Sequence, residues 1–269
     1  TESVSLIEVA ARTVLQNKWT DEEKNALPKR GDESWIGLYQ EFLKLFRLPL
    51  QFDKLVSVNL DYVDSSDKTK VYTKVGAFNG AAICSNIMRA GKHTVYFQIN
   101  ANDSTNYEML CGIMRPTTKD ITSLERCDPA SNDLSRFSLK EYETLHNDNV
   151  DCYLMDTSSG FCLIRPRWKI WKEFELMAMD EEQRMEAQMQ NLCLPKPSLM
   201  QNWVGMEETE QTSFKIGFVL DLDEGTLDVY KNDRRLGTIK RGLVGEYCWV
   251  ASLFNVSRTD EETSVTIGR

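Results

Sequence analysis

The stretch from Phe214 to Ile239 constrains the fold more than any other part of this 269-residue chain. Apolar residues occupy every second position from Ile216 to Leu222, which is the two-residue period of a strand with one buried face. The pairs Glu224-Gly225 and Asn232-Asp233 interrupt the pattern with residues typical of tight turns. The stretch therefore predicts a strand meander, and its apolar face needs a second sheet to cover it.

The rest of the chain divides into a helical beginning and a strand-rich remainder. Leu6, Val9 and Ala10 recur at helical spacing, Asp32 is placed to cap a second helix, and Pro49 stops it. Beyond residue 51, alternating segments predict further strands, and these lie at residues 56–63, 70–75 and 94–99.

The strand pattern carries a family resemblance. LDLDEGTLDVYKNDRRLG resembles the signature of SPRY domains, with Asp233 in place of the usual glycine. The matching residues are Tyr230, Asn232, Leu236 and Gly237. The segments GKHTVYFQI, MLCGIMRP and YCWVASLF are similar to other strands of that family, in the same order. The resemblance covers residues 52–268, with one large interruption.

The resemblance implies a mainly β chain, an SPRY-type antiparallel β-sandwich with N-terminal helices and a helical insertion. We expect residues 1–50 to form a helical segment and residues 51–269 to form the sandwich. The insertion is expected at about 116–211, where Asp180 and Gln183 have the spacing of a capping box at a helix start.

The N-terminal segment carries a second resemblance. DESWIGLYQEFLKLF is similar to the end of an F-box, with Trp35 and Tyr39 as the matching aromatic pair. The family's opening L-P-x-E segment is missing from this sequence. The resemblance implies that Trp35 and Tyr39 contact a ubiquitin ligase adaptor. The alternative is an amphipathic helix pair that packs on the sandwich.

The SPRY resemblance implies non-enzymatic recognition of a protein or peptide through loops at one end of the sandwich. Asn102, Asp103 and Asn106, in a polar hairpin tip, are candidate contacts, as is Arg115 at a strand end. For Arg115 the alternative is a solvated charge. Trp168 and Trp203 lie in the insertion and are candidate interface anchors. For such tryptophans the alternative is to cover one face of the sandwich.

Composition narrows the class of partner. A net charge of −9 without a basic cluster argues against nucleic acid, and no apolar run approaches the length of a membrane span. Seven cysteines with no C-x-x-C pair, beside two histidines, predict reduced core thiols in an intracellular protein. We expect no metal site and no cofactor.

The sequence does not match the motifs of known catalytic and ligand-binding loops well. RAGKHT lacks the first glycine of a phosphate loop, and DLDEG has its glycine one position early for a calcium loop. Asp221 and Asp223 have the same-face spacing of a glycosidase pair, but alternation places them opposite the apolar face. We therefore expect a protein that is not an enzyme. A lectin-like carbohydrate-binding sandwich stays open as the alternative.

Overall fold

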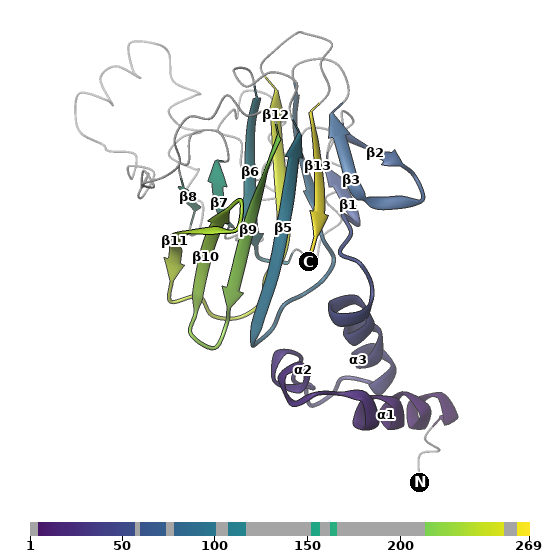
Figure 1. Ribbon diagram of the computed structural model, residues 1–269. Helices are drawn as coiled ribbons and strands as arrows, with labels where there is room; N and C mark the ends of the chain where they lie inside the picture. The colour runs from purple at the N-terminus through teal and green to yellow at the C-terminus, as the bar shows by residue number, and fades with distance from the viewer. Residues whose placement is uncertain are drawn as a thin grey trace, which may run out of the picture.

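The computed structural model describes residues 5–56, 60–73, 78–100, 107–116, 152–156, 162–165, 213–255 and 263–269. The N-terminal helices lie together at one end of a β-sandwich (Figure 1). They are α1 (Leu6–Lys18), α2 (Asp21–Ala26), α3 (Trp35–Phe42) and the π-helical turn η1 (Leu43–Arg47). No helix among these residues is long and apolar enough to cross a membrane.

One layer of the sandwich is a six-stranded antiparallel sheet in the order β1-β4-β12-β6-β7-β8. Its strands are β1 (Lys54–Val56), β4 (Phe78–Ile83), β6 (Tyr107–Met114), β7 (Cys152–Asp156), β8 (Cys162–Arg165) and β12 (Cys248–Asn255).

The other layer is a seven-stranded antiparallel sheet in the order β11-β10-β9-β5-β13-β3-β2. Its strands are β2 (Leu60–Asp64), β3 (Asp67–Thr73), β5 (Lys92–Asn100), β9 (Ser213–Asp221), β10 (Thr226–Lys231), β11 (Arg234–Arg241) and β13 (Ser264–Gly268).

Aromatic side chains fill the space between the two sheets. The Phe218 ring lies 5.9 Å from that of Phe97 and 6.5 Å from that of Trp249, which projects from the opposite sheet. The predicted mainly β fold with two antiparallel sheets and N-terminal helices is confirmed. The helix expected from Asp180 lies outside the described residues.

Both predicted turns of the meander are present. Gly225 has a φ of +64°, and a Cβ added there would lie 2.8 Å from the carbonyl oxygen of Leu243. Asn232 and Asp233 form the two-residue turn between β10 and β11 with φ values of 48° and 65°. This left-handed pair is the mirror-image turn that matches strand twist, and glycine usually occupies its second position.

The helical segment departs from the sequence expectations in three places. Ser34, not Asp32, caps α3, because its hydroxyl accepts a hydrogen bond from the Gly37 amide at 3.0 Å. The polar stretch after Trp19 forms α2, for which Thr20 and Glu23 make a reciprocal capping box. In α1 the buried residues are Ala11 and Leu15, while Leu6 is 86% exposed. Periodicity identified the helix but not which of its apolar stripes is buried.

The sandwich has two distinct ends. At the junction end, next to the helices, lie the connection between β4 and β5, the turn after Asp221 and the loop before Cys248. At the far end lie Asn100, which pairs with Ser213, and Tyr107, which pairs with Asn255. Register therefore puts the connection between β5 and β6 at the far end.

Candidate functional site

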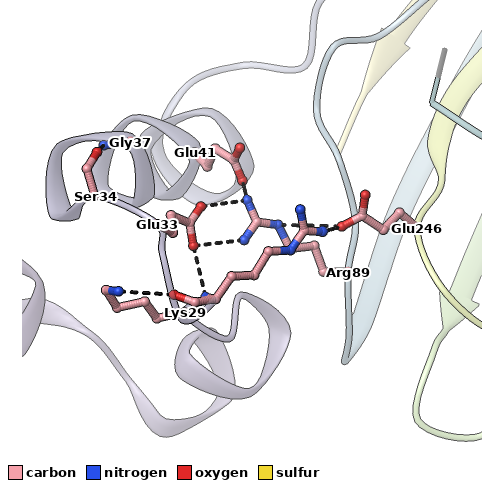
Figure 2. A network of polar contacts seen from close by, with 8 residues as sticks. Lys29, Glu33, Ser34, Gly37, Glu41, Arg89 and Glu246 are labelled. Carbon is pink, nitrogen blue, oxygen red and sulfur yellow. Dashed lines mark hydrogen bonds and ion pairs between the residues drawn. The ribbon is translucent and has the colours of Figure 1, made fainter. Parts of the chain in front are cut away.

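Arg89 is the centre of a polar network that joins the helices to the sandwich at the junction end (Figure 2). Its side chain is only 6% exposed. The guanidinium donates two hydrogen bonds to the Glu33 carboxylate, at 2.8 and 3.1 Å, and forms an ion pair with Glu41. Because both carboxylates belong to the helical segment and Arg89 precedes β5, the two parts are linked by buried charge.

A second ion pair extends the network. Arg30, in the loop before α3, pairs with Glu246, which precedes β12. The Nε atom of Arg89 lies 4.0 Å from the same glutamate. Lys29 closes the loop locally by donating to the Arg30 carbonyl at 3.0 Å. Carboxylates and guanidinium groups thus alternate across the junction, so each charge faces an opposite one.

The network shifts the titration of its members. Hydrogen bonds from Arg89 hold the pKa of Glu33 below its ordinary value, against burial, which raises it. For Arg89 burial lowers the pKa, but the hydrogen bonds and negative charge of Glu33 and Glu41 outweigh it, and the net pKa is raised. Both ions are therefore charged at neutral pH, and the pair stabilises the docked helices.

Pro49 creates a second attachment between the helical segment and the sandwich. Leu48 donates its amide to the Leu43 carbonyl at 2.8 Å, in the register of a π turn. The next donor in that register is Pro49, which has no N–H, so the Lys44 carbonyl loses its helical partner. Asn86 and Arg269 donate to it instead, at 2.6 and 2.7 Å.

Close backbone contact completes the junction. Gly91 has a φ of +69°, and a Cβ there would lie 2.9 Å from the Cα and Cβ of Ala26 in α2. Leu27, Leu38 and other apolar residues of the helical segment belong to the same buried cluster as the sandwich core. The junction end is therefore covered by the chain's own helices.

Trp35 and Tyr39 lie within the helical segment. The Trp35 ring has the cations of Arg12 and Lys29 at 5.5 and 5.4 Å from its centroid. Tyr39 stacks on Phe42 at 6.4 Å. Both aromatic side chains are partly buried against the core, so their main contacts are with the chain itself. Their predicted contact with a ligase adaptor stays a prediction.

Arg115 packs at the junction end. Its guanidinium lies 4.2 Å from the centroid of the Tyr247 ring and donates to the Glu246 carbonyl at 3.2 Å. A Cβ at Gly245 would approach its Nη1 to 2.6 Å, so the lack of a side chain there makes room for it. Arg115 thus orders the loop that carries Glu246, and the structure places it away from the far end.

The predicted loop contacts Asn102, Asp103 and Asn106 lie outside the described residues, as do Trp168 and Trp203. The flanking strands present a polar row beside that loop. Ser213 donates to Asn100 at 2.8 Å and accepts from Gln98 at 3.0 Å. Lys215 pairs with Asp233 at 2.9 Å and lies 4.8 Å from the centroid of the Tyr96 ring. Polar side chains are therefore held on rigid strands at the far end.

The residues considered for catalysis have structural contacts. Asp221 accepts hydrogen bonds from the amides of Asp223 and Glu224 at 3.2 and 3.0 Å, and these, chiefly the bond from Glu224, lower its pKa. Asp223 accepts from the Gly91 amide at 3.0 Å. The two carboxylates thus stabilise the turn and its contact with the β4–β5 connection.

Titratable side chains in the core are buried, and burial shifts their pKa values. The buried His93 ring lies 2.8 Å, through Nε2, from the Ala90 carbonyl, and burial lowers its pKa. Burial also raises the pKa of the Cys84 thiol. In the described part of the chain, no three His, Cys, Asp or Glu residues are grouped to hold a metal ion.

Sequence reasoning missed the Arg89 network. In the sequence, Arg89 is only the first residue of RAGKHT, which does not match a phosphate loop, and Glu33 and Glu41 are ordinary residues of an amphipathic segment. The signal that could have identified them is weak. A lone arginine between apolar strand patterns, with two glutamates on a helix that must pack somewhere, becomes meaningful only when their positions in space are known.

Comparison with solved structures gives β-sandwich neighbours of low identity. The SPRY domain of human HERC1 is 14% identical, over 81% of this chain and 96% of that one, with a TM-score of 0.44. The carbohydrate recognition domain of Emp46p is 11% identical, over 93% and 98%, with a TM-score of 0.43. Arcelin-5, a lectin-like defense protein from Phaseolus vulgaris, is 12% identical, over 82% and 94%, with a TM-score of 0.44.

SPRY domains and lectin-like sandwiches are thus both among the structural neighbours. No protein-family model matches the chain, and the comparison with curated proteins gives no match. The fold assignment rests on the order and register of the chain's own strands.

Proposed function

We propose that this protein is a non-enzymatic recognition module that binds a protein or peptide at the far end of its sandwich. The observation that carries the proposal is the contrast between the ends. Helices and buried ion pairs occupy the junction end, whereas the far end presents Asn100, Ser213 and Lys215 beside the loop of Asn102, Asp103 and Asn106. Recognition residues commonly lie on loops that a rigid scaffold positions.

Site-specific photo-crosslinking in cells tests this proposal. A photoreactive amino acid is placed at Asn102 or Asn106 at the far end, and at Val244 at the junction end as the matched control. Val244 is 70% exposed, so it is open to a passing protein. We expect a discrete crosslinked partner from the far-end positions and none from Val244. Equal crosslinking from both ends, or none from the far end, would refute the assignment.

A finer proposal concerns the helices. If the F-box resemblance reflects a shared role, the chain is a substrate receptor of a ubiquitin ligase, and the helical segment binds the adaptor. The exposed apolar residues of α1, Leu6, Ile7 and Val9, support this because they lie away from the sandwich core. Pull-down of the adaptor with the intact protein, and its loss in Leu6→Glu, would support the role. Failure to recover the adaptor would leave a free-standing binding module.

The lectin-like alternative rests on a different surface. On the outer face of the seven-stranded sheet, Tyr96 and Tyr230 pair in register with Gly217 from either side. Tyrosines on a polar face offer an apolar ring with a polar tip, which suits a ligand with both kinds of surface. A glycan array decides between the two ligand classes. Binding that Tyr230→Ala abolishes, while Asn106→Ala leaves it intact, would favour the carbohydrate.

A further inference from the structure

Strand β11 concentrates positive charge at one edge of the seven-stranded sheet. It pairs with β10 and is the last strand on that side of the sheet (Figure 1). It contains Arg234, Arg235, Lys240 and Arg241 and no acidic residue, in a chain whose net charge is −9. In the sequence these cations are two pairs separated by uncharged residues, and the strand places both pairs along one edge. We call these four residues the basic edge.

Two cations of the basic edge have partners within the chain. Arg235 donates two hydrogen bonds to the Asp228 carboxylate, both at 3.0 Å. The Nζ atom of Lys240 lies 5.7 Å from the centroid of the Tyr153 ring, which belongs to the opposite sheet. The side chains of Arg234 and Arg241 are exposed, and in the described part of the chain they form no hydrogen bond or ion pair. Two guanidinium groups are therefore available to a ligand.

The other arginines with described side chains are not available in this way. Each contacts a carboxylate, an aromatic ring or a backbone carbonyl. They are Arg12, Arg30, Arg47, Arg89, Arg115, Arg235 and Arg269. The two exceptions, Arg234 and Arg241, lie on one strand and are separated by at most about 23 Å of extended chain.

A charged edge can also serve to keep a sheet from pairing with other chains. At β11 this protection is already supplied by two irregularities in the ladder with β10, between Leu227 and Asp228 and between Val229 and Tyr230. Protection also needs no single sign of charge, since protein surfaces usually intersperse both signs. The same irregularities disfavour the addition of a further strand, so the attraction of this edge for a ligand is electrostatic.

The basic edge begins at the far end of the sandwich. The amide of Asn232, in the turn before β11, donates to the Lys215 carbonyl at 2.8 Å, and Lys215 belongs to the polar row at that end. Arg241 aligns with Thr226, which aligns with Asp221 at the junction end. A partner held at the far end therefore meets Arg234 first and has the rest of β11 beside it.

We propose that an acidic peptide segment of the partner docks along the basic edge. Its carboxylates would pair with Arg234 and Arg241, to which the described chain itself offers no carboxylate. Nucleic acid suits this edge less well, because the remainder of the chain is strongly negative and repels a long phosphate backbone. The inference names the class of partner for the recognition proposed above and rests on that proposal.

NMR titration of the intact protein with a defined peptide tests the inference. The probe has about twelve residues, enough to span β11, with glutamate at every second position and serine between. A peptide with glutamine in place of each glutamate is the control for charge. We expect the glutamate peptide to shift amide signals of β11 but not of β2, with an affinity that falls as salt is added. The glutamine peptide should cause no such shifts.

Charge variants locate the contact. Arg234→Glu and Arg241→Glu should each weaken binding of the glutamate peptide by about fivefold or more. The matched control is Lys18→Glu, which makes the same change at an exposed cation of α1 and should alter the affinity by less than about twofold. If a glutamate variant fails to fold, Arg234→Gln and Arg241→Gln replace it, each with a loss of about threefold.

Several results would overturn the proposal: no binding, shifts that lie outside β11, or an equal loss in Lys18→Glu. Equally tight binding of single-stranded DNA of the same charge would also overturn it, in favour of a phosphate-binding edge. The outcome is separable from that of the proposed function. A partner that crosslinks at Asn106 equally well in Arg234→Glu and Arg241→Glu would leave the recognition module in place and remove the acidic segment.

Discussion

The two ends of the sandwich are built on different physical principles. At the junction end, charges are buried and paired across elements distant in sequence, as Arg89 is with Glu33 and Glu41. At the far end, polar side chains such as Asn100, Ser213 and Lys215 bond to close neighbours on adjacent strands and keep solvent contact. Buried pairs fix one arrangement of the backbone, whereas exposed polar rows leave donors and acceptors for a ligand. The difference separates the end that holds the helices in place from the end at which we propose that a partner binds.

The largest effect should come from breaking the buried pair. Arg89→Met keeps most of the side-chain volume but leaves Glu33 and Glu41 without their partner. We expect the free energy of unfolding to fall by about 3 kcal/mol, because an uncompensated buried charge is costly. Urea denaturation measures it. The control is Arg235→Met, which removes an exposed ion pair with Asp228 and should leave the midpoint unchanged. Equal effects would erase the distinction between buried and exposed pairs.

The next effect tests the close backbone contact at the junction. Gly91→Ala places a methyl group against Ala26 and forces alanine into a left-handed conformation, and we expect a loss of about 2–3 kcal/mol. Gly242→Ala is the matched control, since its φ of +73° imposes the same strain in open space. Its cost should be only about 1 kcal/mol. Thermal unfolding of the two variants compares them, and similar melting temperatures would show that α2 does not press on Gly91.

A smaller effect appears in the pH dependence. The pKa of Glu33 is lowered in the folded protein, so its ion pair stabilises the fold at pH values above the ordinary pKa of about 4.5. This stability is lost as the pH falls through the lowered folded value. Glu33→Gln should therefore cost about 1 kcal/mol at pH 7, and the difference from the parent should narrow below pH 4.5. A gap that widens on acidification would contradict the sign of the shift.

The smallest effect lies at the far end. Asp233→Gly relieves a left-handed residue in a turn that favours glycine, at the expense of an exposed ion pair with Lys215. We expect stabilisation by about 0.5 kcal/mol, seen as a small rise in melting temperature. The reverse sign would mean that the ion pair outweighs the backbone strain.

Local sequence patterns predict much of this fold. Alternation around Phe218 and the turn pairs Glu224-Gly225 and Asn232-Asp233 predicted the meander, because strand period and turn conformation depend on neighbouring residues. The cap of α3 was misplaced from Ser34 to Asp32, since both side chains can cap a helix and only the path of the chain decides between them.

The candidate site was less predictable for a physical reason. The Arg89–Glu33 pair joins residues 56 positions apart, and the bond from Arg269 to Lys44 spans 225 positions. No local pattern specifies such contacts. The Lys44 carbonyl is an example with a clear chemical cause, because Pro49 has no N–H to donate to it. The sequence shows that this donor is missing, but it does not show which groups replace it.

The position of β13 in the seven-stranded sheet constrains the order in which that sheet can form during synthesis. It is the last described strand in the order of synthesis, yet it lies between β5 and β3 and pairs with both. Until a ribosome has delivered residues 264–268, the seven-stranded sheet is two separate pieces with open edges. Such edges invite pairing with other chains. A chain that lacked residues 264–268 would therefore leave this sheet in two pieces, each with an edge open to pairing with other chains.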